Sequence, residues 1–280
     1  MSAMTDMPES AGRMLFDVPA SEYHKRELGV ASNSVLKILR EKTPAHYRHW
    51  VDAPPEPETP SLAFGRAYHC RVLEPGIYRH FYAVAPDFGD MRSSINREKR
   101  DRWVSENPGV TLLSAADAQT IEDMHAALMS HRLAAGMMQA GHSEVTMRWE
   151  DSETGVRCKA RADWIDPGNF VMDLKTTDDA SPSGFAKSIA KYGYHIQGAH
   201  YRDGAVQCGE PTPAFLILAQ EKSPPYLPAV YCVNVDAELA GYEQRNAGLR
   251  VMRDCLARNE WPGYPAGISE IQLPSWALKD

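Results

Sequence analysis

Two acidic residues and one basic residue, Asp163, Asp173 and Lys175, are spaced so that they could act together at one site. The two aspartates stand on either side of a Pro-Gly turn, each in a short apolar segment. Two strands joined by a tight turn would bring their carboxylates together, and Asp173 and Lys175, two residues apart on a strand, would share a face. Paired carboxylates suit a hard divalent cation. A lysine beside that cation could position or deprotonate a water and offset charge on a phosphate, so the set suits phosphodiester hydrolysis.

A surface hairpin with an Asp–Lys ion pair is the simpler interpretation of an Asp-x-Lys spacing taken alone. Here, however, Asp173 follows the apolar residues Phe170, Val171 and Met172. Its charge would therefore lie at the end of a buried strand, where an unpaired charge is costly unless a metal or a partner compensates. This context favours a functional site over a surface ion pair.

The periodicity of the apolar side chains predicts the strands and helices that carry these residues. Short alternating or apolar segments bounded by turn residues predict strands at 144–150, 157–165, 170–174, 214–219 and 229–235. Helical spacing and capping signals predict helices after 31–34, over 62–73, after Ser114, over 183–190 and 196–206, and after Asp236. This order predicts an α/β fold of the mixed α+β kind, with a central mixed sheet flanked by helices.

Length and composition limit the possible classes of protein. The chain has 280 residues, of which 43% are apolar, and a formal net charge of −7. Such a charge argues against a protein that coats DNA with a basic surface, although a local basic patch would suffice to bind phosphate. The sequence lacks a run of about 18–20 apolar residues, which a membrane span needs, and a secretory signal at its start. We therefore expect a cytoplasmic protein without membrane contact.

The domain organisation is expected to be simple. Residues 1–20 lack periodicity and predict a flexible N-terminal tail, and residues 21–280 predict a single domain. Within it, a proline-rich linker is expected near 52–60 and a basic loop or insertion near 86–110. The five cysteines are scattered singly, which favours neither disulfides nor a zinc or iron–sulfur centre.

Several short motifs together resemble a known family. The segment 171–176 after an upstream Asp163 is similar to the motif of PD-(D/E)XK nucleases. Residues 65–69, ending in His69, resemble a helix-borne histidine of the exodeoxyribonuclease VIII (RecE-like) branch, which is related to lambda exonuclease and the RecB nuclease domain. Gln197 and Tyr201 resemble its Gln-x-x-x-Tyr helix, and residues 31–34 with 43–47 resemble its N-terminal segment. The similarity covers roughly residues 22–235.

The resemblance implies roles for the catalytic and metal-binding residues. His69, Asp163, Asp173 and the backbone carbonyl of Leu174 are implied to bind Mg²⁺, with Mn²⁺ as a substitute, and Lys175 is implied to be the catalytic lysine. Glu144 corresponds to a further catalytic acid, with Glu150 as a rival for that position.

The resemblance also implies DNA contacts. Gln197 and Tyr201, one helical turn apart, are implied to lie beside the active site and the DNA. The helix N-terminus at Ser32 and Ser34, with Lys37 and Arg40, could bind a DNA 5′-phosphate, although the two serines are equally explained as ordinary helix caps.

As a whole, the resemblance implies an exodeoxyribonuclease that degrades linear double-stranded DNA from its ends in recombination or repair. Digestion from 5′ to 3′ that leaves a 3′ single strand, a trimeric or tetrameric ring, and a single-strand annealing protein of the phage type as partner are implied with it. A structure-specific endonuclease of the same fold and a catalytically inactive DNA-binding module are the alternatives. The dispersed cysteines argue against the iron–sulfur branches of the superfamily.

Overall fold

The computed structural model describes residues 12–274 and 277 and is built around a seven-stranded mixed sheet. Six strands follow the order β1-β5-β6-β7-β8-β9, and β2 pairs in parallel with β6. Neighbouring strands along this order are antiparallel except β7 and β8, which are parallel. The strands of this sheet are β1 Arg13–Leu15, β2 Val30–Ala31, β5 His142–Glu150, β6 Arg157–Asp166, β7 Phe170–Thr177, β8 Ala214–Glu221 and β9 Pro228–Cys232. The predicted α/β fold with a central mixed sheet is confirmed.

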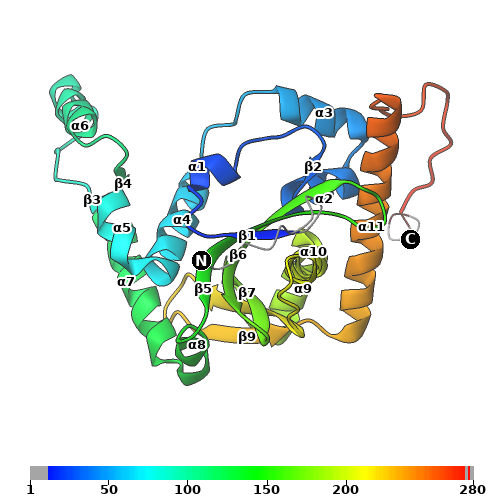
Figure 1. Ribbon diagram of the computed structural model, residues 1–280. Coiled ribbons are helices and arrows are strands. Elements are labelled where there is room, and N and C mark those ends of the chain that lie inside the picture. Colours follow the sequence, from blue (N-terminus) through cyan, green and yellow to red (C-terminus); the bar gives the residue numbers. More distant parts are fainter. Residues whose placement is uncertain (1–11, 275–276, 278–280) are drawn as a thin grey trace, which may run out of the picture.

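Helices cover both faces of this sheet (Figure 1). One face packs against α2 Asn33–Glu41, α10 Tyr194–Gln207 and α11 Val235–Arg258, and the other against α4 Pro60–Leu73 and α7 Ala115–Ser130. The remaining helices are α1 Ala20–Tyr23, α3 Pro44–Asp52, α5 Pro75–Phe81, α6 Ser94–Glu106, α8 Arg132–Met137 and α9 Pro182–Tyr192. Two short strands form a separate parallel pair between α5 and α7 in the chain order. They are β3 Tyr82–Val84 and β4 Thr111–Leu113. None of the described helices combines the length and the apolar character that crossing a membrane requires.

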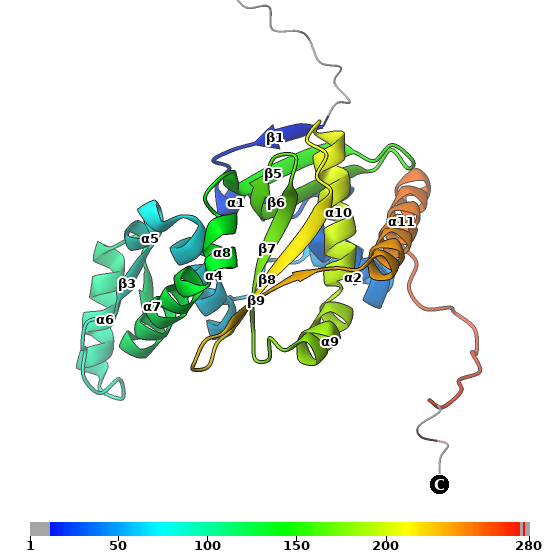
Figure 2. The same ribbon diagram turned by 90° about the horizontal axis from the view of Figure 1, so that it is seen from below.

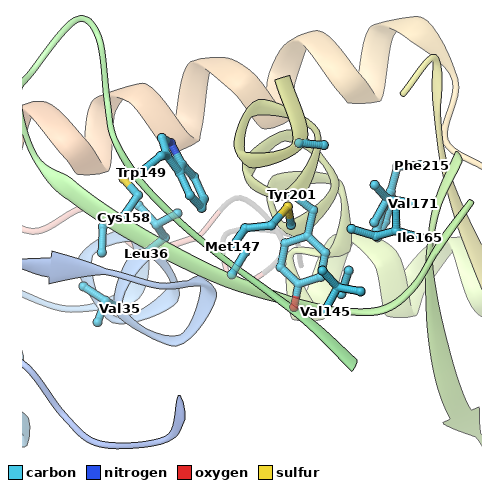
Figure 3. Packing of buried hydrophobic residues seen from close by; sticks show 14 of the residues in the cluster. Val35, Leu36, Val145, Met147, Trp149, Cys158, Ile165, Val171, Tyr201 and Phe215 are labelled. Carbon is cyan, nitrogen blue, oxygen red and sulfur yellow. The ribbon is translucent and has the colours of Figure 1, made fainter. Parts of the chain in front are cut away.

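Strand β7 shows how the sequence pattern fixes the two faces. Successive side chains of a strand point to opposite faces, so Val171 packs into the core under α10 while Met172 and Leu174 pack into the core under α4 and α7. In Figure 3, Tyr201 of α10 lies beside Met147 and Val145 of β5 in the first of these cores. The same alternation leaves Asp173 and Lys175 on the α10 side of the sheet.

Two expectations about the chain outside the core need correction. Residues 13–15 of the predicted N-terminal tail form β1, which pairs antiparallel with β5, while residues 1–11 lie outside the described part. The basic segment 86–110 is not mainly a loop, because α6 spans Ser94–Glu106. This helix has no buried residue and projects from the body of the molecule (Figure 2). An exposed helix needs no apolar stripe, which explains why periodicity did not reveal it.

Candidate active site

The strands β6 and β7 separate at the two aspartates. Their pairing runs from Asp166 opposite Phe170 to Trp164 opposite Met172 and ends there, one residue before Asp163 would face Asp173. At this point the Asp163 carboxylate accepts a hydrogen bond from the Leu174 backbone amide at 2.7 Å. The Asp163 side chain thus provides a hydrogen-bond acceptor for the Leu174 amide, which no longer pairs with β6 at this point. The splayed strands hold both carboxylates near each other, as the hairpin pattern predicts.

Three side chains from three elements form a group that could hold a metal ion. His69 of α4, Glu144 of β5 and Asp163 of β6 each offer one ligand atom, and these atoms lie within 4.8 Å of one another. The Nδ1 atom of His69 is 3.5 Å from Oδ2 of Asp163. The Leu174 backbone also belongs to this group, because its amide donates a hydrogen bond to Oδ2 of Asp163. Sequence reasoning had singled out all four of these residues.

The structure also separates the two glutamates that competed for the additional acidic position. Glu144 lies between the paired positions Ser143–Trp164 and Val145–Ala162, and therefore faces Asp163 across β5 and β6. Glu150 lies at the opposite end of β5, exposed and opposite Arg157. Only Glu144 has the placement that the additional acidic residue would need.

Burial and like charge shift the acidity of this group. Burial, and then the neighbouring charge of Asp173, raises the pKa of Asp163 to about 8. Burial and the charge of Asp163 raise the pKa of Glu144 to about 7, although Arg161 opposes this rise. Burial lowers the pKa of His69, and the charge of Lys175 lowers it further. The imidazole is therefore neutral at pH 7, which is the form that binds metals.

Asp173 has partners of its own, Lys175 and Gln197. Its residue is 2% exposed, and its carboxylate forms an ion pair with Lys175 and accepts a hydrogen bond from the side-chain amide of Gln197. The Nζ atom of Lys175 lies 4.8 Å from the centre of the Tyr194 ring. Burial lowers the pKa of Lys175, but Asp173 and Asp163 outweigh this and raise it above its usual value. Lys175 is therefore protonated at neutral pH.

Two residues that sequence reasoning missed complete the surroundings. Arg161 forms an ion pair with Glu144 and donates a hydrogen bond to the Val18 carbonyl at 2.9 Å. The ring of Tyr23 in α1 lies 5.7 Å from the Arg161 guanidinium, and the charges of Asp163 and Glu144 raise its pKa in addition to burial. The spacing of Arg161 and Asp163, two residues apart on one strand, could have identified Arg161. Tyr23 carries no such local signal.

The residues expected to bind DNA fall into two groups. Gln197 and Tyr201 are 2% and 6% exposed, so neither offers an open surface, and their expected direct contact with DNA is not supported. Ser32 is the N-cap of α2 and accepts a hydrogen bond from Val35 at 3.4 Å. The remaining three, Ser34, Lys37 and Arg40, are on α2, where Ser34 and Lys37 are exposed.

Comparison with known proteins places this architecture in a family. A family model described as a PDDEXK-like domain of unknown function (DUF3799) matches residues 32–272. The chain belongs to this family. A comparison with curated proteins found no match. Membership in the PD-(D/E)XK superfamily, which the motif around Asp163 and Asp173 predicted, is thereby confirmed.

The fold of this PDDEXK-like domain is similar to that of a solved structure. A candidate exonuclease from Eubacterium rectale superposes with a TM-score of 0.58 at 17% identity, covering 89% of this chain and 96% of that chain. An alkaline exonuclease from Laribacter hongkongensis gives a TM-score of 0.29 at 13% identity, covering 70% of this chain and 97% of that one. At this identity the first likeness establishes the fold alone.

The residues of this PDDEXK-like domain fit a divalent metal ion by their chemistry. Two carboxylates and a neutral imidazole are suitable ligands for divalent cations. The buried Oδ2 of Asp173 has no hydrogen-bond partner, although the Lys175 ammonium lies beside it. A cation would relieve the repulsion that raises the pKa values of Asp163 and Glu144. Among the described residues, this donor set therefore fits a divalent cation.

Proposed function

We propose that this protein is a Mg²⁺-dependent exodeoxyribonuclease that degrades linear double-stranded DNA from its ends. The observation that supports this most strongly is the convergence of His69, Glu144 and Asp163 beside the buried Asp173–Lys175 pair. The carboxyl groups of Glu144 and Asp163 are so crowded that they hold protons near pH 7. Such crowding costs electrostatic free energy. Such a cluster is expected at a functional site rather than in a merely structural core.

The side chains divide the work between binding and positioning. Asp163, Glu144, His69 and the Leu174 carbonyl would hold the cation, with Asp173 as a further carboxylate ligand. When bound, the cation supplies Lewis-acid activation of the phosphate and a water of lowered pKa. Lys175 holds a proton at Nζ, and its positive charge would offset the negative charge that develops on the phosphate oxygens. Asp173 keeps that ammonium in place, and Gln197 keeps Asp173 in place.

Dependence on DNA ends is supported by resemblance rather than by the geometry of these residues. The structural neighbour from Eubacterium rectale carries an exonuclease name, and the motif order resembles the exodeoxyribonuclease VIII branch. Digestion from 5′ to 3′, a ring-shaped oligomer, a single-strand annealing partner and a cytoplasmic role in recombination or repair belong to the same proposal.

The test is degradation of duplex DNA with Mg²⁺, comparing a linear end-labelled substrate with a closed circle of the same sequence. Loss of the linear substrate while the circle persists is the expected result, and cleavage of the circle would instead indicate the endonuclease alternative. Asp163→Asn and Lys175→Met should abolish most activity. Asp166→Asn at the turn and Lys187→Met on the exposed side of α9 are matched controls that should remain active. An inactive wild type that still binds DNA would overturn the proposal in favour of a binding module.

A further inference from the structure

Two tyrosines extend from the catalytic lysine toward the surface. The ring of Tyr194 lies 4.8 Å from Nζ of Lys175, and the ring of Tyr192 stacks beside it, with centroids 5.7 Å apart and an interplanar angle of 28°. Tyr194 is partly buried and contacts Phe185 in the core. Tyr192 is 42% exposed. The pair therefore connects the buried active site with a ring that is open to solvent.

Two lysines from different helices converge on the outer ring. The ammonium of Lys37 in α2 lies 5.5 Å from the Tyr192 ring centre, and that of Lys191 in α9 lies 5.2 Å from it. Both lysines are exposed, and neither has a carboxylate partner among the ion pairs of the described residues. Positive charge that no neighbouring carboxylate neutralises remains available to a phosphate.

The backbone at the junction of α9 and α10 holds this arrangement in place. Gly193 has a φ of +73°, and a Cβ atom there would lie 2.5 Å from the Arg40 guanidinium. Arg40 in turn donates a hydrogen bond to the Lys191 carbonyl at 3.4 Å. The left-handed backbone conformation of this turn favours glycine. The rings of Tyr192 and Tyr194 are thus fixed relative to α2, which carries Lys37.

We infer that Tyr192, flanked by Lys37 and Lys191, is a stacking platform for a base of the single DNA strand next to the reactive phosphate. Aromatic rings that stack bases, beside lysines that track the backbone, bind single strands without reading their sequence. A duplex would not suit this ring, because paired bases are stacked on one another and present no free face to it. The inference rests on the proposed function, which identifies the strand as DNA. The platform would bind this strand after it has separated from the duplex.

A purely structural role explains Tyr192 less well. Large aromatic residues stabilise a fold by burying their rings, yet the Tyr192 ring is exposed and is not part of either hydrophobic core cluster of the described residues. Tyr194, by contrast, packs against the first cluster. The outer tyrosine is therefore the one whose removal should affect binding rather than folding.

Binding of a short oligo(dT) labelled with fluorescein, measured by anisotropy in EDTA, tests the platform without cleavage. Tyr192→Ala should weaken binding about 5- to 150-fold, the range expected for the loss of one stacked base, while Tyr192→Phe should bind like the wild type. Lys37→Ala and Lys191→Ala should each weaken binding and reduce its dependence on salt. Tyr264→Ala, which removes an exposed tyrosine elsewhere, is the matched control, and thermal unfolding of each variant checks that the fold is retained.

The outcomes separate the platform from the proposed activity. Equal binding by Tyr192→Ala and the wild type, no binding by the wild type, or a preference for oligo(rU) would overturn the platform even if the protein degrades DNA. Binding that depends on Tyr192 in a protein that degrades no DNA would support the platform and overturn the proposed function.

Discussion

The side-chain amide of Gln197 in α10 donates a hydrogen bond to Oδ1 of Asp173 in β7. Both residues are almost fully buried, so the contact links the helix to the strand beside the candidate active site. Because Oδ1 is occupied by Gln197, the other oxygen of Asp173 is the one beside Lys175. We therefore propose that Gln197 positions the Asp173–Lys175 pair.

Gln197→Leu should lower kcat about 10- to 100-fold, as is usual when a hydrogen-bond partner of a metal-site carboxylate is removed. The affinity for DNA should change little, because Gln197 is buried away from the surface. Steady-state kinetics on end-labelled duplex measures both effects, with Gln119→Leu on the exposed face of α7 as a control. An unchanged kcat in Gln197→Leu would contradict the positioning role.

Binding of the divalent cation should become tighter as the pH rises through about 7 to 8. The pKa of Glu144 is raised to about 7 and that of Asp163 to about 8, so below these values a cation must displace protons from both carboxyls. Titration calorimetry with Mn²⁺ at pH 6.5 in two buffers of different ionisation enthalpy should show release of roughly one to two protons. Glu144→Gln should reduce that release. An affinity independent of pH, without proton release, would exclude this coupling.

His200 should make the protein sensitive to acid. Burial lowers its pKa from 6.5 to about 3, with a contribution from Arg245, so the native state holds it neutral while the unfolded state becomes charged below pH 6.5. Its contribution to stability is therefore complete above pH 6.5 and decreases as the pH falls toward 3, by roughly 1.4 kcal/mol per pH unit.

Urea unfolding at pH 7, 6 and 5 measures this effect of His200. The wild type should lose more stability than His200→Gln over this range, whereas the exposed control His49→Gln should behave like the wild type. Parallel losses in the wild type and His200→Gln would show that His200 does not carry the effect.

Helix α11 passes close to the start of α10 at Gly241. A side chain added at Gly241 should therefore lower stability, although this residue has no catalytic role. A Cβ atom on Gly241 of α11 would lie 2.3 Å from the His195 carbonyl oxygen at the start of α10. Gly241→Ala should therefore destabilise the protein by about 1–3 kcal/mol, the usual cost of overpacking. Gly136→Ala in α8, where a Cβ would meet no described atom within 4 Å, should be neutral or slightly stabilising. Equal urea midpoints for the two variants would contradict this packing.

Local pattern predicted the centre of the site, because strand alternation and one turn suffice to bring Asp163, Asp173 and Lys175 together. Tyr23 was out of reach, since its position depends on packing of α1 beside β6, far away in sequence. The exposed helix α6 lacks the apolar stripe from which helices are recognised. The burial of Gln197 did not follow from the sequence either. Its spacing from Tyr201 shows that the two share a helix face, but not which other elements pack against that face. Thus the hairpin followed from local sequence, whereas the surroundings required the tertiary fold.

A crystal soaked in Mn²⁺ tests whether His69, Glu144 and Asp163 hold a divalent ion. We expect an anomalous difference peak in contact with those three side chains, which disappears in crystals of Asp163→Asn but persists in Asp166→Asn. A Mn²⁺ peak bound elsewhere in a protein that degrades DNA, or a peak unchanged in Asp163→Asn, would contradict it.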